Sequence, residues 1–173
     1  YSCGKDAVVQ FVVRDGDVPT QIAYRCTCSD ERLFKEPDER DKILDRSFKK
    51  KRIPFWYPCD VPIPIIQKER FQFLHELFTR RNLIALSTIF NAIEGLEDPK
   101  IREVMKLAFT AALDKCSRLK PLSRSKSDSR PSLSESWVAV RFYAPTMWQE
   151  VNPWHAFARS FEKVYKGKKE SNA

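Results

Sequence analysis

Apolar positions at the start of the chain follow the pattern of two short strands. Residues 7–13 form a β-branched run, residues 14–17 carry an Asp-Gly turn signal, and residues 21–25 return as a second apolar run. A run, a turn and a return run of this kind predict a β-hairpin. We assign residues 1–35 to a first segment built on this hairpin.

A charged stretch and a proline-rich connector make up the second segment, residues 36–66. Residues 36–52 are typical of a helix because Pro37 suits the first helical position, acidic residues follow it, and basic residues end the stretch. Residues 53–64 contain four prolines, which exclude a helix or a central strand. We expect an extended connector there, packed down by the aromatic residues 55–57.

Helical periodicity dominates the third segment, residues 67–169. Apolar residues recur at spacings of three and four within residues 67–117, which predicts successive helices and places the core there. Thr79 is a capping residue for one of them, and Asp98-Pro99 is a helix start signal. The helix from Asp98-Pro99 is expected to run to about Arg118.

The end of the third segment mixes a loop, a strand and a helix. Residues 119–135 are rich in serine, proline and basic residues and predict a mobile loop. Residues 137–143 alternate as a strand does, and Asn152-Pro153 starts a last helix whose tail is expected to fray beyond Gly167. The fold class is therefore α+β: a zinc-ribbon-like N-terminal β-hairpin, a helical core of three to five helices, one late strand and a C-terminal helix.

The net charge of the chain indicates what kind of partner it binds. The 173 residues carry a formal net charge of +8, which favours an anionic partner such as nucleic acid over an acidic membrane surface. The alternative is a protein that is merely basic. No apolar run approaches the roughly 20 residues of a membrane span, and no signal-peptide stretch is present, so we expect a cytoplasmic protein with no membrane partner. Five cysteines, an odd number, fit reduced thiols better than a complete disulfide framework.

Three cysteines lie outside the two predicted strands, at the open end of the hairpin. Cys3 precedes the first strand, and Cys26 and Cys28 follow the second. An antiparallel pair brings these ends together, as a shared metal requires. Structural zinc takes four ligands, and Cys3-Gly4 fits the second half of a Cys-x-x-Cys-Gly knuckle. We therefore expect the missing cysteine just before Tyr1, in a longer protein of which this chain is a piece.

Other arrangements of these thiols stay open. Cys59 completes the site if the proline-rich connector folds back, and His75 and His155 are further candidates on predicted helices. Alternatively the thiols bind no metal, or Cys3 forms a disulfide with Cys26 or Cys28. Cys116, late in a helix, is expected to be buried packing.

Basic residues gather in three groups, and each can contact phosphates or form an ordinary solvated face. The first follows the charged helix, the second is a pair of arginines, and the third extends from Lys115 into the loop at 119–135. The candidate DNA-binding residues are Lys49, Lys50, Lys51, Arg52, Arg80, Arg81, Lys120, Arg124, Lys126 and Arg130.

Motifs for catalysis are missing from the sequence. It contains no Gly-x-Gly-x-x-Gly, Walker loop, Gly-x-Ser-x-Gly or His-Glu-x-x-His, and only 4 glycines against 11 prolines. The two histidines are isolated from each other. We therefore expect that this chain alone is not a catalyst.

Three stretches resemble a segment of large bacterial and archaeal DNA methylases, which are S-adenosylmethionine-dependent enzymes that methylate the exocyclic amino group of adenine or cytosine. The stretches are E-L-F-T-R-R-N-L-I-A-L-S-T-I-F-N-A-I-E, I-R-E-V-M-K-L-A-F-T-A-A-L and E-V-N-P-W-H-A-F-A-R-S-F-E-K-V-Y-K-G-K. Phe78–Leu83 is the most specific part. The likeness covers most of residues 1–169.

The resemblance implies a target-recognition insert that contacts double-stranded DNA. In such enzymes the cofactor-binding glycine motif precedes the insert and the Asp-Pro-Pro-Tyr catalytic motif follows it, so S-adenosylmethionine would bind only the parent enzyme. The expected partners are then DNA and the remainder of the methyltransferase chain. The alternative is a structural or protein-interaction module with a degenerate zinc ribbon.

Overall fold

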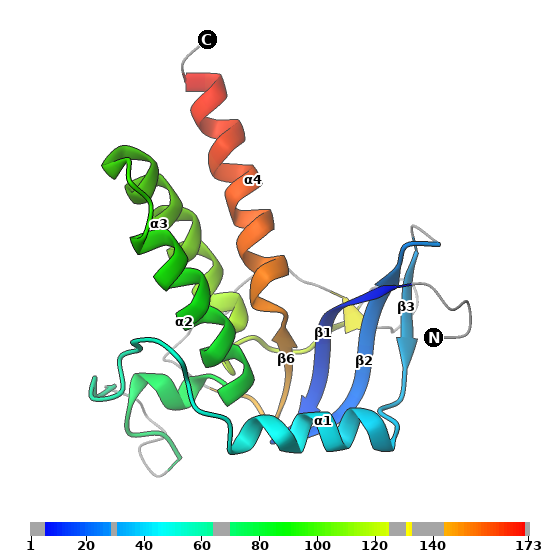
Figure 1. Ribbon diagram of the computed structural model, residues 1–173. Helices are drawn as coiled ribbons and strands as arrows, with labels where there is room; N and C mark the ends of the chain where they lie inside the picture. Colours follow the sequence, from blue (N-terminus) through cyan, green and yellow to red (C-terminus); the bar gives the residue numbers. More distant parts are fainter. Residues whose placement is uncertain (1–5, 29–30, 64–69, 125–130, 133–143, 172–173) are drawn as a thin grey trace.

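The computed structural model describes residues 6–28, 31–63, 70–124, 131–132 and 144–171 (Figure 1). An antiparallel sheet packs beside a group of helices, so the predicted α+β class is confirmed. The predicted strand at 137–143 lies outside the described residues.

The main sheet has the strand order β3-β2-β1-β6. Its strands are β1 (Ala7–Asp15), β2 (Val18–Cys26), β3 (Arg32–Lys35) and β6 (Met147–Val151). The predicted hairpin is therefore present, and Gly16 makes its turn with a φ of 56°, in the left-handed region that favours glycine. On the other side of β1, Phe11 pairs with Val151 and Asp15 pairs with Met147, so the chain's late strand completes a sheet begun at its start.

Capping side chains set where the described α-helices begin, and before the last of them Asn152 accepts from the Trp154 N–H at 3.0 Å. Helix α1 (Glu39–Lys49) follows Asp38, which forms a capping box with Asp41. Thr79 caps α2 (Arg80–Glu94), and Asp98 caps α3 (Pro99–Leu113), as the sequence predicted. Helix α4 (Pro153–Ser171) starts after Asn152 as expected.

Some predicted bounds were wrong. Helix α1 is shorter at both ends than the expected 36–52, because the cap lies at Asp38 and the regular turns end at Lys49. Helix α4 continues past Gly167 to Ser171 instead of fraying. The apolar repeat around residues 71–78 gives only a short 3₁₀ helix, η1 (Leu74–Leu77), since Phe73 and Phe78 on either side have extended backbones. A second 3₁₀ turn, η2 (Asp114–Cys116), continues α3 and ends it before Arg118.

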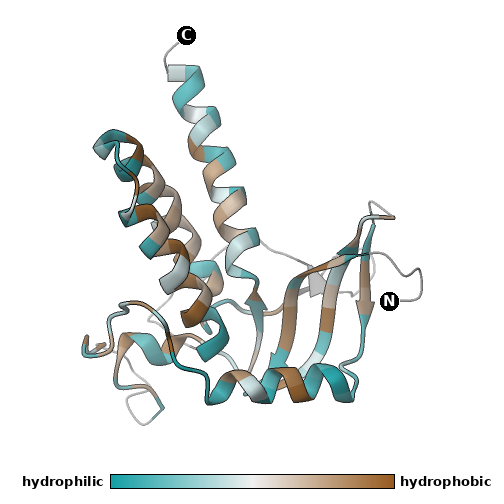
Figure 2. Cartoon of the chain, viewed as in Figure 1, coloured by the Kyte–Doolittle hydropathy of each residue, from teal (hydrophilic) through white to brown (hydrophobic). Residues whose placement is uncertain are grey.

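The core lies between the sheet and helices α2, α3 and α4. Its main cluster joins strand residues to helix residues, including Phe11, Val13, Leu86, Ala108 and Phe157. The core is thus not confined to residues 67–117, because the hairpin contributes its inner face. Figure 2 shows hydrophobic positions on the central strands and on α2 and α3, whereas α1, which crosses the strands, is mostly hydrophilic. No residue of α1 is buried.

Candidate nucleic-acid interface

Two basic groups that are distant in the sequence meet where α1 ends and α2 begins. Helix α1 ends at Lys49, and residues 50–52 follow it directly. The four side chains of Lys49–Arg52 are all exposed. Arg80 and Arg81 open α2. The Arg80 Nε donates a hydrogen bond to the Lys51 carbonyl oxygen at 2.6 Å, which ties the two groups together. We call these six residues the basic corner.

Helix geometry adds to the positive potential of the basic corner. The first turn of α2 presents backbone N–H groups, and the N-terminal end of a helix carries partial positive charge. Thr79 satisfies one of these groups by accepting from the Asn82 N–H at 3.2 Å. The full positive charges of Arg80 and Arg81 therefore add to the partial positive charge at the N-terminal end of α2.

A pocket of about 240 Å³ opens beside the basic corner. Five basic side chains and two carboxylates line it, so its lining is net positive. We call it the basic pocket; its residues are Arg14, Asp17, Asp45, Phe48, Lys49, Thr79, Arg80, Arg81 and Arg118.

Glu150, a buried residue on β6, holds Arg14 and Arg81 in place. Its carboxylate is 1% exposed and accepts from Arg14 Nε at 2.6 Å and from Arg81 Nη2 at 2.5 Å. The Thr79 hydroxyl donates to its other oxygen. Arg14 also pairs with Asp45 on α1. Charge-assisted bonds of this kind hold a guanidinium in one orientation.

The surroundings of Arg14 keep it charged although it is buried. Burial lowers the pKa of a guanidinium, but the negative charges and hydrogen bonds of Glu150 and Asp45 outweigh this effect and raise the pKa of Arg14. The basic pocket therefore has a permanent positive charge in its wall.

Arg118 also lines the basic pocket, and its guanidinium packs against a tryptophan ring. Its guanidinium lies 5.2 Å from the Trp148 ring centre, and its Nη1 pairs with Asp17 at 2.7 Å. The Trp148 Nε1 donates to the Gly16 carbonyl at 2.8 Å and so fixes the β1–β2 turn that carries Asp17. Burial raises the pKa of Asp17, but the hydrogen bond from Arg118 and the charges of Arg118, Lys49 and Arg14 lower it overall.

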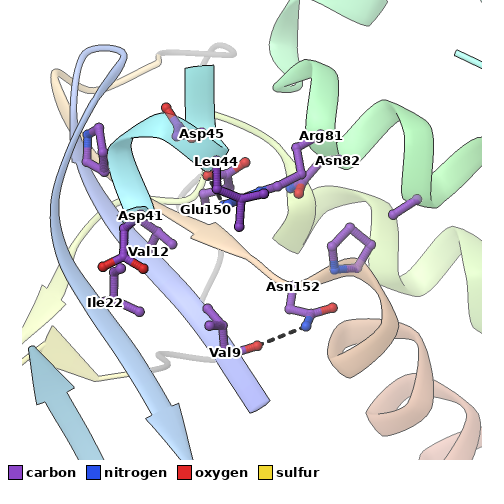
Figure 3. A pocket seen from close by; sticks show the side chains of 13 residues that line it. Val9, Val12, Ile22, Asp41, Leu44, Asp45, Arg81, Asn82, Glu150 and Asn152 are labelled. Carbon is purple, nitrogen blue, oxygen red and sulfur yellow. Dashed lines mark hydrogen bonds and ion pairs between the residues drawn. The ribbon is translucent and has the colours of Figure 1, made fainter. Parts of the chain in front are cut away.

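A second pocket, of about 280 Å³, adjoins the basic pocket and shares Asp45 and Arg81 with it. It lies between strands β1 and β2 on one side and helices α1 and α2 on the other (Figure 3). The Asn152 Nδ2 donates to the Val9 carbonyl at 2.8 Å along one wall. No serine, cysteine or histidine is among its described lining residues, so these residues include no Ser-His or Cys-His pair.

Of the remaining predicted DNA-binding residues, the structure describes Lys120 and the backbone of Arg124. Lys120 is only 2% exposed, so its side chain is not offered at the surface, contrary to our expectation. Its carbonyl accepts from the Gln149 N–H at 3.0 Å, because residues 120–121 lie against the outer edge of β6. Arg124 belongs by its backbone to the two-residue strand β4 (Ser123–Arg124), which pairs with β5 (Pro131–Ser132). Lys126 and Arg130 lie outside the described residues.

Arg14 was not among the predicted site residues, because residues 14–17 have the pattern of a hairpin turn. Its partner Glu150 is 136 residues away in sequence, so local spacing carries no signal of the pair. The only hint was an arginine directly after the apolar residues 11–13, since buried charges are rare unless paired.

The cysteine site is partly described. Ala7 pairs with Cys26, and the Thr27 N–H donates to the Asp6 carbonyl at 3.2 Å, so residues 6 and 7 lie beside the end of the second strand. The sulfurs of Cys26 and Cys28 are 2.8 Å apart. Cys3 lies outside the described residues. Within the described part of the chain, no group of three or more Cys, His, Asp or Glu is placed to hold a metal ion.

The other candidate ligands have separate surroundings. Cys59 is exposed on the connector, and Cys116 is fully buried as predicted, with burial raising the pKa of its thiol. His75 lies between the rings of Tyr57 and Phe73. On α4, burial and then the charge of Arg159 lower the pKa of His155. Cys26 and Cys28 could supply two of the four ligands of a tetrahedral zinc site, but their sulfurs, 2.8 Å apart, would first have to separate to about 3.8 Å.

None of the described helices combines the length and apolar character that a bilayer crossing requires. Comparisons of the chain with protein-family models, with curated proteins and with solved structures found no match.

Proposed function

We propose that this chain is the DNA-contacting, target-recognition segment of an S-adenosylmethionine-dependent DNA amino-methyltransferase and is not catalytic alone. The observation that carries the proposal is the basic corner, where two groups separated by some thirty residues meet beside a net positive pocket. Phosphates are bound by such convergent lysines and arginines, and the contacts position a protein on a duplex.

The family resemblance and the geometry point to the same place. Phe78–Leu83, the most specific part of the resemblance, contains Thr79, Arg80 and Arg81, which line the basic pocket. A methyltransferase that extrudes its target base must hold the distorted duplex meanwhile. We assign that holding task to this segment.

The rest of such an enzyme would supply the chemistry. S-adenosylmethionine and the catalytic motif belong to other parts of the methyltransferase chain, which is then the second partner of this segment, in the cytoplasm. Cys26 and Cys28 would hold structural zinc together with Cys3 and a fourth ligand. That metal would fix the open end of the hairpin and take no part in methyl transfer.

Binding of a labelled DNA duplex, followed by fluorescence anisotropy over a range of salt concentrations, tests the proposal. Replacing Lys50, Lys51 and Arg52 together by alanine should weaken binding and reduce the slope of log K against log salt by up to about 3, roughly 1 for each lost phosphate contact. All three side chains are exposed.

A matched control removes the same charge elsewhere. Three exposed lysines lie outside the basic corner: Lys100 at the start of α3, and Lys168 and Lys169 at the end of α4. Their triple alanine variant should bind nearly as the unchanged protein does. Equal losses in both variants, or no binding at low salt, would contradict the proposal.

An apolar pocket of about 250 Å³ favours the alternative function, a protein-interaction module. Trp56, Phe78, Phe90 and Phe109 are among its lining residues, and Trp56 is 70% exposed. A module that uses this surface would show weak binding to DNA with little dependence on salt. The same titration therefore separates the two functions.

A further inference from the structure

We propose that the basic pocket is a site for a single phosphate group, and that the Asp17 carboxylate takes the place of that phosphate when no ligand is bound. That the phosphate belongs to a DNA backbone rests on the proposed function. The argument for the site itself uses only the side chains that line the pocket.

The two carboxylates of the basic pocket differ in how firmly they are held. Asp45 pairs with the buried Arg14, whose guanidinium Glu150 also holds, so Asp45 is part of the wall. Asp17 lies on the hairpin turn with a side chain that is 67% exposed, and among the described residues it forms an ion pair only with Arg118. Only the Asp17 side of this pair faces solvent, because the Arg118 side chain is 14% exposed. An incoming anion can therefore reach the pair and replace Asp17 as the counter-charge of Arg118, so that Arg118 is not left unpaired.

Basic groups remain available for such an anion. Lys49 and Arg80 form no ion pair with any described residue, and the one hydrogen bond from the Arg80 side chain uses its Nε. The Arg118 Nε is buried without a hydrogen-bond partner among the described residues. Release from Asp17 would also free Arg118 Nη1 for the ligand.

Phosphate matches this arrangement better than a carboxylate does. Its tetrahedral oxygens can accept from several donors at once, and inorganic phosphate also carries more negative charge than a carboxylate, whereas a DNA phosphodiester carries the same single charge. The Arg118 guanidinium is held over Trp148, and Arg14 and Arg81 are held by Glu150. Three of the five basic groups are therefore oriented before a ligand arrives, which lowers the entropy lost on binding.

Changing Asp17→Asn tests the proposal, because it removes a competing charge and keeps the shape of the side chain. The variant should bind inorganic phosphate, followed by calorimetry or by NMR shifts of the Gly16 amide, about three- to tenfold more tightly at low salt. Lys49→Ala should weaken phosphate binding by a similar factor. Asp15→Asn is the matched control, since Asp15 is exposed on the same hairpin and does not line the pocket.

The outcomes distinguish the site from the proposed function. If Asp17→Asn and Asp15→Asn bind phosphate equally, or Lys49→Ala binds as the unchanged protein does, the phosphate site is refuted, even where duplex binding stays strong and salt-dependent. If Asp17→Asn gains phosphate affinity while no variant binds duplex DNA, the site stands and the proposed function fails.

Discussion

Asn82 illustrates how single polar residues join distant parts of this protein. Its side chain is 1% exposed, and its Nδ2 donates to the Cys116 carbonyl at 2.9 Å and to the Val151 carbonyl at 3.2 Å. One amide on the first turn of α2 thus satisfies acceptors from η2 and from the end of β6. Buried carbonyls need such partners, because losing them costs the desolvation of the group.

Replacing Asn82 by leucine should therefore destabilise the protein. Both carbonyls would lose a buried donor, and we expect the free energy of unfolding to fall by about 2–4 kcal/mol. Urea unfolding followed by circular dichroism measures the change. Asn91→Leu, at an exposed position on the same helix, should stay within about 0.5 kcal/mol of the unchanged protein. Similar losses for both variants would show that the buried amide has no special role.

At the scale of elements, the start of α1 depends on two carboxylates. The Asp38 side chain accepts from the Asp41 N–H at 3.0 Å, and the Asp41 side chain accepts from the Asp38 N–H at 3.0 Å. The hydrogen bond from the Asp41 backbone and then the one from Lys35 lower the pKa of Asp38 to about 2, from an ordinary 3.8.

This lowered pKa predicts that α1 loses stability in acid. Because the folded-state value lies below the unfolded one, the stabilisation is complete above about pH 4 and is lost as the pH falls through about 2. Titration of the Asp38 carboxyl carbon by NMR should give a midpoint near 2. Asp38→Asn retains a capping side chain and should remove this part of the acid dependence. A midpoint near 4 would contradict the prediction.

At the scale of the whole molecule, Glu150 is the point where the sheet meets two helices. It lies on β6 and bonds Arg14 on β1 and Arg81 on α2, while Arg14 bonds Asp45 on α1. The core likewise draws on the hairpin and on α2, α3 and α4. We therefore expect one cooperative unfolding transition instead of separate transitions for residues 1–35, 36–66 and 67–169.

Changing Glu150→Gln should destabilise that single unit strongly. Two arginines would lose a buried counter-charge, and breaking a buried ion pair from one side costs about 3–5 kcal/mol. Thermal unfolding followed by calorimetry should show a lower midpoint with one transition. Glu103→Gln, on an exposed side of α3, is the control and should change little. Two resolved transitions in the unchanged protein would contradict the cooperative unit.

Local sequence was enough to predict the features that depend on near neighbours. The hairpin, the caps at Thr79 and Asp98, the start of α4 and the burial of Cys116 follow from turn residues, capping side chains and apolar spacing. These signals act over a few residues, so a single sequence carries them. The repeat at 71–78 shows their limit, because apolar spacing alone does not make a helix once extended backbone is required on either side.

Only the tertiary structure decided how the charged residues are used. The pairing of β1 with β6 brings Arg14 to Glu150, the bond from Arg80 to Lys51 joins two basic groups, and the packing of residues 120–121 on β6 buries Lys120. Such contacts form between segments far apart in the chain, and their energy depends on burial and distance. Composition therefore favoured an anionic partner, whereas the fold decided which basic side chains are gathered at the surface and which are paired or buried.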